Sequence, residues 1–165
     1  MMAFMHNSLD SNATAGLPTV AWLRWHSERL DTISDQDRVI QWLLDRQIRN
    51  LGFQGRPSKD ADVCYSFWCG ASLQILGAHS YIDSASDVAW ILSAQSPMSG
   101  IAKTPGELPD VLHSYLGYVA LSMHQHELEG PSLPFAPVSA ALNISRESLD
   151  WLYSHLWTRK ASYIP

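Results

Sequence analysis

Apolar and polar positions along the chain form two kinds of helical segment. Residues 63–76 are apolar on nearly every side, which is typical of a helix buried over most of its surface. Residues 83–95 gather their apolar side chains on one face, as an amphipathic helix does. The pattern predicts a second buried helix over 110–123. It also predicts a further outer helix that begins at Ser34 and continues to about residue 49.

Glycine and proline mark the connections between these helices. Residues 52–57 and 99–109 are predicted to be turns, and Gly77 is expected to end the first buried helix. Ser145 predicts the start of a last helix that reaches about residue 157. Almost nothing indicates β-structure, so the predicted fold class is all-α.

The chain repeats itself at a spacing of 48 residues, because residues 40–73 align with residues 88–121. A fixed period of this length indicates stacked units that bury their apolar faces against one another. Each unit consists of an outer helix, a turn and an inner helix, which predicts part of an α/α toroid with the starts of its inner helices on one rim. Nine pairs are identical: Trp42/Trp90, Leu44/Leu92, Gln47/Gln95, Gly52/Gly100, Pro57/Pro105, Asp62/Asp110, Val63/Val111, Ser66/Ser114 and Leu73/Leu121.

The N-terminal region lacks this pattern. Residues 1–16 are polar and show no periodicity, so we expect them to be poorly ordered. Residues 19–30 can form a helix. We therefore predict a single repeat domain over residues 17–165.

Composition limits the classes of function. The chain has 165 residues, of which 46% are apolar and 16% charged, and this suits a globular domain with much buried surface. A net charge of −5 gives no general attraction to nucleic acid or anionic lipid. We expect no membrane-spanning segment and no signal peptide. Cys64 and Cys69 would point apart on a helix, so a disulfide is not expected and a cytoplasmic location fits.

The two copies differ where chemistry is expected. Cys64 stands where the second copy has Leu112, and His113 stands where the first copy has Tyr65. With Asp62, these residues supply oxygen, sulfur and nitrogen donors at neighbouring helix starts. Three protein ligands leave one position of zinc open, as in catalytic sites. The alternative is that Cys64 and His113 are ordinary core residues, which the spacing alone does not exclude.

Basic residues lie in the turn before these ligands. Arg56 and Lys59 occupy the first turn, whereas the second copy has Thr104 and Glu107 at the aligned positions, so the positive charge is expected in one turn only. Two cations on the rim can bind an anion such as phosphate. Helix N-termini also favour anions and lower the pKa of a thiol. The alternative is a solvated basic turn.

Two aromatic residues follow the candidate ligand Cys64. Tyr65 can donate a hydrogen bond to the same anion, and Trp68 can line an apolar cavity; both are alternatively plain core residues. His124 and His126 make a weak metal pattern, because residues two apart do not share a helix face.

Residues 51–73, L-G-F-Q-G-R-P-S-K-D-A-D-V-C-Y-S-F-W-C-G-A-S-L, closely resemble the signature of protein prenyltransferase β subunits. Residues 91–122 and 141–145 are most similar to protein geranylgeranyltransferase type I. The resemblance covers about residues 36–150. It implies the C-terminal half of an α/α barrel, since the subunits of this family are roughly twice as long as this chain.

The resemblance implies a role for each matching residue. It makes Asp62, Cys64 and His113 the zinc ligands. It assigns the diphosphate of the isoprenoid to Arg56, Lys59 and Tyr65. It also places Trp68 and Leu112 beside the isoprenoid and the CaaX peptide, and Leu112 replaces an aromatic residue that farnesyl enzymes carry.

The implied activity is transfer of geranylgeranyl from geranylgeranyl diphosphate to a zinc-bound C-terminal cysteine. The substrate would be a CaaX protein ending in Leu, and the chain would act as a heterodimer with an α subunit. Two alternatives stay open. The chain is either a farnesyltransferase β subunit, or a truncated and non-catalytic α/α-repeat fragment that only binds partners.

Overall fold

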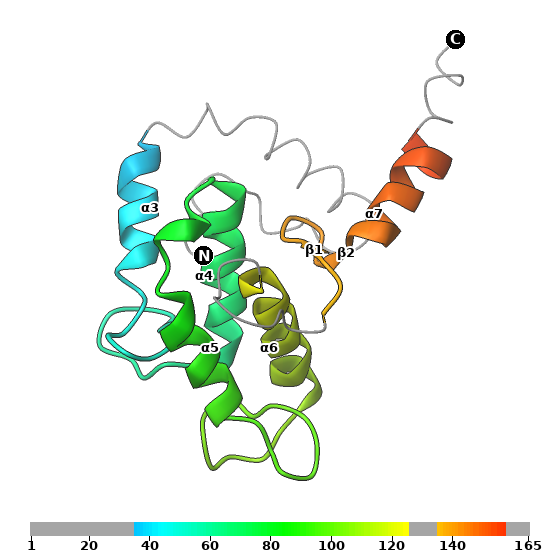
Figure 1. The fold of residues 1–165 in the computed structure, drawn as a ribbon. Coiled ribbons are helices and arrows are strands. Elements are labelled where there is room, and N and C mark those ends of the chain that lie inside the picture. The colour runs from blue at the N-terminus through cyan, green and yellow to red at the C-terminus, as the bar shows by residue number, and fades with distance from the viewer. Residues whose placement is uncertain (1–34, 126–134, 158–165) are drawn as a thin grey trace, which may run out of the picture.

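The computed structural model describes residues 35–125 and 135–157, and these form helices joined by ordered turns (Figure 1). The predictions for residues 1–34, including the helix over 19–30 and the Ser34 cap, lie outside the described residues. The elements are α3 (Gln36–Leu44), α4 (Val63–Ile75), η3 (His79–Tyr81), α5 (Ser84–Ser93), α6 (Val111–His124), β1 (Val138–Ser139), β2 (Ile144–Ser145), α7 (Arg146–Leu152) and the π-helical turn η4 (Tyr153–Trp157).

An aspartate side chain caps each of the helices α3, α4, α5 and α6 at its N-terminus. Asp62, Asp83 and Asp110 cap α4, α5 and α6, and each carboxylate accepts a hydrogen bond from a backbone N–H of the first turn. Asp35 caps α3 in the same way. Ser145 caps α7 as the sequence predicted.

The predicted end of α3 was wrong. The helix ends at Leu44 rather than near residue 49, because the chain turns back on itself immediately afterwards. The amide of Gln54 donates to the carbonyl of Arg46 at 2.9 Å, and an antiparallel bridge joins Gln47 to Phe53. Helical periodicity carries no information on such an isolated bridge, because it pairs only one residue on each side.

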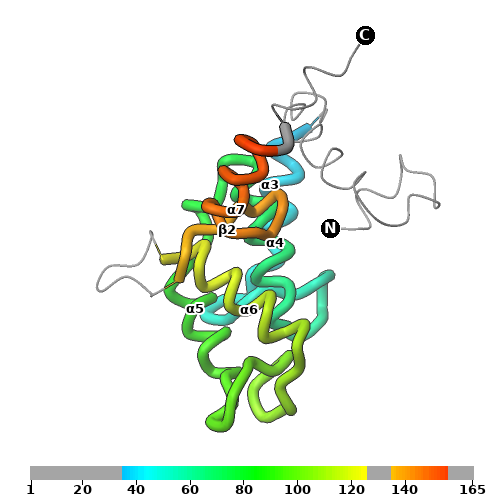
Figure 2. The backbone as a smooth tube through the Cα atoms, turned by 90° about the vertical axis from the view of Figure 1, so that its right-hand side faces the viewer, coloured from blue at the N-terminus to red at the C-terminus, as the bar shows by residue number. Residues whose placement is uncertain are grey.

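The 48-residue repeat is confirmed in the backbone. The bridge between Gln47 and Phe53 recurs between Gln95 and Ile101, 48 residues later. Helix α3 packs on α4, and α5 packs on both α4 and α6. The inner helices α4 and α6 lie side by side and run in the same direction, so their N-termini share one end of the molecule (Figures 1 and 2).

The main core lies between α4 and α6, which form the most extensive contact among the elements that the structure describes. Gly117 permits this approach, because a Cβ atom there would lie 2.9 Å from Cδ1 of Ile101 and 3.1 Å from Cγ1 of Val63. The fully buried large residues of the two core clusters are Phe53, Val63, Leu73, Ile91, Ile101 and Leu121.

A buried polar network joins α4, α5 and α6. The hydroxyl of Ser66 donates to Oδ1 of Asp87 at 2.7 Å, and Nε2 of His124 lies 2.8 Å from Oδ2 of the same carboxylate. Nδ1 of His124 lies 3.0 Å from the hydroxyl of Ser84. The network therefore accounts for His124 as a structural residue, whereas His126 lies outside the described residues.

A short hairpin follows the second repeat. Strands β1 and β2 pair antiparallel, with Val138 opposite Ser145. The sequence pattern predicted almost no β-structure, so this hairpin was not expected. The hydroxyl of Ser122 donates to the carbonyl of Ala136 at 2.6 Å and holds the hairpin against α6. Figure 2 shows the hairpin and α7 at the end of the molecule away from the N-termini of α4 and α6. Within the described ranges, no helix is long and apolar enough to cross a bilayer.

Candidate metal centre and anion cavity

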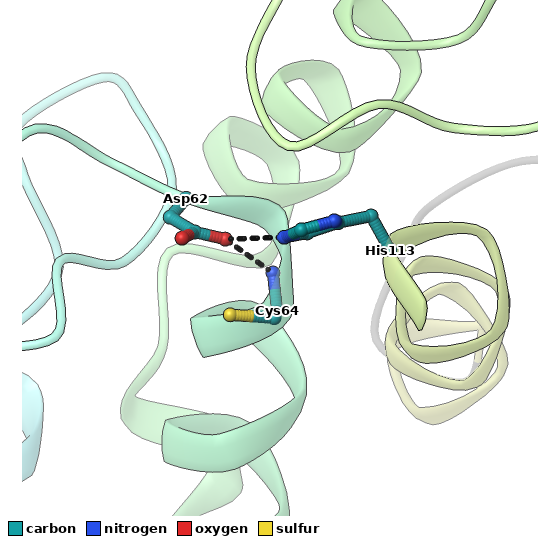
Figure 3. A group of neighbouring side chains, drawn as sticks. All are labelled: Asp62, Cys64 and His113. Atoms are coloured by element: carbon teal, nitrogen blue, oxygen red, sulfur yellow. Dashed lines mark hydrogen bonds and ion pairs between the residues drawn. The ribbon is translucent and has the colours of Figure 1, made fainter. Parts of the chain in front are cut away.

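Three side chains converge where α4 and α6 begin. One donor atom from each of Asp62, Cys64 and His113 lies within 4.8 Å of the other two (Figure 3). Asp62 and Cys64 come from the start of α4, and His113 points toward them from the first turn of α6. The structure thus brings together Cys64 and His113, the two residues that differ between the copies, with Asp62, the aspartate at the start of α4.

Backbone hydrogen bonds fix this convergence. Oδ1 of Asp62 accepts from the amide of Cys64 at 3.0 Å, which holds the carboxylate over the first turn of α4. The amide of Val63 donates to the carbonyl of Lys103 at 3.0 Å and ties the start of α4 to the second turn. As a result, Nε2 of His113 lies 3.3 Å from Oδ1 of Asp62.

The imidazole of His113 has a second carboxylate on its other side. Nδ1 lies 2.6 Å from Oδ2 of Asp110, and the amide of His113 donates to Oδ1 of Asp110 at 2.9 Å. These hydrogen bonds hold the pKa of Asp110 below its usual value, the backbone bond contributing most. A carboxylate therefore lies beside each ring nitrogen of His113.

Burial is the main cause of the pKa shift of the Cys64 thiol. Desolvation raises its pKa well above the usual value, the adjacent Asp62 carboxylate raises it further, and Lys103 lowers it only partly. The expectation that the helix N-terminus would lower this pKa was wrong for the metal-free chain. Cys64 is partly buried, and its burial together with the Asp62 carboxylate acts against the partial positive charge of the helix end.

A cavity of about 470 Å³ opens beside the three donors. Asp62 belongs to both, so the cavity and the donor cluster are continuous. Burial raises the pKa of Tyr65, which keeps its phenol protonated and able to donate. The cavity is lined by Gly55, Arg56, Lys59, Asp60, Ala61, Asp62, Tyr65, Lys103, Thr104 and Glu107.

Sequence reasoning missed one cation of this cavity. It compared only Thr104 and Glu107 with the basic residues of the first turn and concluded that the second turn carries no positive charge. Lys103 precedes Thr104 and lines the same cavity as Arg56 and Lys59. A comparison of every position in the two turns would have found it, because the turns align without a gap.

Close packing holds Tyr65 in the cavity wall. A Cβ atom on Gly55 would lie 2.2 Å from Cζ of Tyr65, so the phenol ring rests directly on the glycine backbone. Glycine at this position is therefore required for the observed orientation of the ring.

Trp68 and Leu112, the residues predicted beside the apolar substrates, belong neither to the donor cluster nor to this cavity. Trp68 is partly buried against the main core, and its ring meets that of Phe67 edge-on with centroids 5.1 Å apart. Leu112 is 56% exposed at the start of α6. Each adjoins a site residue along its helix, but neither contributes to the polar cavity.

Known proteins are similar to this chain in fold and in sequence. A solved structure of Candida albicans protein geranylgeranyltransferase-I complexed with GGPP superposes with a TM-score of 0.59 at 26% identity, covering 76% of this chain and 37% of that one. Geranylgeranyl transferase type-1 subunit beta of Dictyostelium discoideum is 42% identical over 127 residues, which is 74% of this chain and 34% of the relative.

Two further relatives extend the comparison. The type-1 subunit beta of Arabidopsis thaliana is 41% identical over 103 residues, 62% of this chain and 28% of the relative. The type-2 subunit beta of Saccharomyces cerevisiae is 37% identical over 100 residues, 59% of this chain and 31% of the relative. The chain thus spans about a third of the length of the relatives it matches. Residues 6–150 match the family described as the prenyltransferase alpha-alpha toroid domain, and the chain belongs to that family.

Proposed function

We propose that this chain supplies the metal and diphosphate sites of a protein geranylgeranyltransferase type I β subunit. The observation that carries the proposal is the convergence of Asp62, Cys64 and His113 beside a cavity lined by three cations. The type-1 β subunits from two organisms, at 41% and 42% identity, support this class.

The donor set fits zinc. One carboxylate, one thiol and one imidazole are all zinc ligands, and three protein ligands leave one tetrahedral position open for a substrate. Asp62, Cys64 and His113 would hold the ion, and their donor atoms already lie within 4.8 Å of one another. A zinc ion bound here would supply the positive charge that favours thiolate at the cysteine of a protein substrate.

The cavity residues act on the diphosphate. Arg56, Lys59 and Lys103 surround the space next to the donors, and Tyr65 adds a protonated phenol. These groups stabilise the negative charge that develops on the leaving diphosphate when the thiolate attacks C1 of the isoprenoid. The solved relative complexed with GGPP supports geranylgeranyl diphosphate as the co-substrate.

Leu112 and Trp68 are assigned to the apolar substrates. Leu112 is exposed at the start of α6, next to His113, where an isoprenoid or a CaaX side chain can reach it. We propose that CaaX proteins ending in Leu are preferred. The chain is also similar to a type-2 β subunit, and a farnesyltransferase is the other alternative. Comparison of protein substrates with different C-terminal residues tests both.

In this proposal the chain acts together with an α subunit. The enzyme is located in the cytoplasm, where the free thiols of Cys64 and Cys69 stay reduced. Since the chain spans about a third of its relatives, other parts of a β subunit are needed for the complete isoprenoid site.

Bound zinc is the first test. Purified chain is expected to hold about one zinc ion, and Cys64→Ala is expected to lose it. Cys69→Ala is the matched control, because Cys69 is buried in the second core cluster away from the donors. No zinc in the wild-type chain would refute the metal site.

Prenyl transfer is the second test. With an α subunit, thioether formation is expected on a peptide ending in Leu and less on peptides ending in Ser or Met. Zinc binding without any thioether would favour the non-catalytic fragment. Preference for Ser or Met would favour the farnesyl alternative.

A further inference from the structure

Thr104 has in the second repeat the place that Arg56 has in the first, since the two residues align in the 48-residue repeat. Both begin a β-turn in which proline is the next residue. The amide of Lys59 donates to the carbonyl of Arg56 at 3.3 Å, and the amide of Glu107 donates to the carbonyl of Thr104 at 3.2 Å. Both Arg56 and Thr104 line the anion cavity. The hydroxyl-bearing residue therefore lies at a position equivalent to that of a cavity cation.

The loop that carries Thr104 is accessible to an enzyme. Residues 102–110 form no helix or strand, and residues 105–108 are exposed. Figure 1 shows this loop at the end of the molecule where α6 begins. Thr104 is followed by Pro105, and a threonine before proline is the pattern that proline-directed protein kinases modify. The loop therefore combines an accessible backbone with a kinase acceptor pattern.

The cations beside Thr104 are available to a phosphate. Arg56, Lys59 and Lys103 form no ion pair within the described ranges. This holds although carboxylates also line the cavity, namely those of Asp60, Asp62 and Glu107. A phosphate on threonine carries a charge of about −1.5 to −2 at neutral pH and can form about one to three charge-assisted hydrogen bonds to such cations. A phosphate attached to Thr104 would therefore find its partners in the cavity that this residue lines.

We propose that Thr104 is a phosphorylation site, and that its phosphate occupies the anion cavity and excludes the diphosphate of the substrate. The inference rests on the proposed diphosphate site and adds regulation to it. A protein kinase transfers the γ-phosphoryl group of ATP to the hydroxyl oxygen of Thr104. The bond from the γ-phosphorus to the oxygen that bridges it to the β-phosphate breaks, a bond to the threonine oxygen forms, the hydroxyl proton passes to the kinase, and ADP leaves.

Pyrophosphate binding before and after treatment with a proline-directed kinase and ATP tests the inference. In the full chain, mass spectrometry is expected to find phosphate on Thr104. An attached group competes at an effective concentration of about 1 mM, so pyrophosphate affinity, measured by calorimetry after removal of the nucleotide, is expected to fall at least about tenfold. The phosphate and the binding are thus measured on the same sample.

Ser96 provides the matched control. It is the other hydroxyl residue that precedes proline in this chain, but it does not line the cavity. Ser96→Ala is expected to respond to the kinase as the wild type does. Thr104→Val is expected to show the same pyrophosphate affinity before and after the treatment, because its side chain has no hydroxyl to accept the phosphoryl group.

A charged side chain at position 104 tests the geometry without a kinase. Thr104→Glu adds a negative charge, and Thr104→Gln has nearly the same size and shape without the charge. The glutamate variant is expected to bind pyrophosphate about fivefold more weakly than the glutamine variant, which is the size of an exposed charge contact. Equal affinities of the two variants would overturn the inference.

The kinase experiment separates the inference from the proposed function. Absence of phosphate on Thr104, or phosphate there with unchanged pyrophosphate affinity, would overturn the inference and leave the proposed diphosphate site standing. If the untreated wild-type chain binds no pyrophosphate, the proposed diphosphate site fails and the inference fails with it. That result appears before any kinase is added, so the two failures are distinct.

Discussion

Replacement of Asp87 by alanine should destabilise the fold more than any surface change, because it breaks the buried network that joins three helices. Asp87 and His124 are both 0% exposed, and Ser66 is equally buried. The carboxylate accepts from Ser66 at 2.7 Å and lies 2.8 Å from Nε2 of His124. Alanine removes both contacts and leaves two polar groups without their partner.

The groups left without a partner give the size of the effect. Each buried polar group left unsatisfied costs about 1–3 kcal/mol, so Ser66 and His124 together cost about 2–6 kcal/mol. An expected loss of about 4 kcal/mol is a large part of the stability of a domain, which is about 5–15 kcal/mol.

Urea unfolding of Asp87→Ala and Asp87→Asn tests this reasoning. The asparagine oxygen can still accept from Ser66, and its amide can donate to Nε2 of His124 once the ring proton moves to Nδ1, facing Ser84. Asn is therefore expected to cost about 1 kcal/mol. Asp150→Ala on the exposed side of α7 is the control, at about 0.5 kcal/mol or less. A loss below about 1 kcal/mol for Asp87→Ala, with an unchanged urea slope, would refute the argument.

Three further predictions concern the site and the helix caps. Lys103→Ala should weaken binding of inorganic pyrophosphate about fivefold by calorimetry, corresponding to the roughly 1 kcal/mol of an exposed charge contact; equal binding would remove Lys103 from the anion site. In metal-free Cys69→Ala protein, Cys64 should react with iodoacetamide at pH 8 at least about tenfold more slowly than a free cysteine does. Burial raises the pKa of the Cys64 thiol, and each unit of pKa lowers the fraction of thiolate about tenfold. A rate equal to that of free cysteine would contradict this. Hydrogen bonds from Ser86 lower the pKa of Asp83, so its stabilising contribution is complete above the unfolded pKa and is lost as pH falls through the folded value. Asp83→Asn should therefore reduce the loss of stability below about pH 4, and acid titrations identical to wild type would count against the cap.

The sequence predicted the family and the repeat correctly because both depend on many positions at once. The long motif over residues 51–73 identified the family, and the match over residues 6–150 confirmed it. The buried helices were correct to within about one residue at α4 and α6, where aspartate caps and apolar periodicity agree. Proximity of Asp62 and His113 followed from their equivalent places in neighbouring units.

The remaining features depend on contacts between distant residues. Helix α3 ends early because Gln47 pairs with Phe53, and periodicity carries no information on such a pairing. The thiol pKa of Cys64 depends on its burial and on Asp62, so a rule for helix ends gave the wrong direction. The contact of Asp110 with Nδ1 of His113 requires a side-chain rotamer that the sequence does not specify.

The hydrogen bond from Val63 to the carbonyl of Lys103 links the two repeats, and it makes the candidate metal centre a property of their interface. In repeat proteins, the free energy of folding is approximately the sum of the stability of each repeat and the interaction energies between neighbouring repeats. Donors drawn from both units meet only while the interface is intact. Slight separation of α4 from α6 would therefore abolish metal binding before either repeat unfolds, and a bound ion would in turn increase the cooperativity of unfolding.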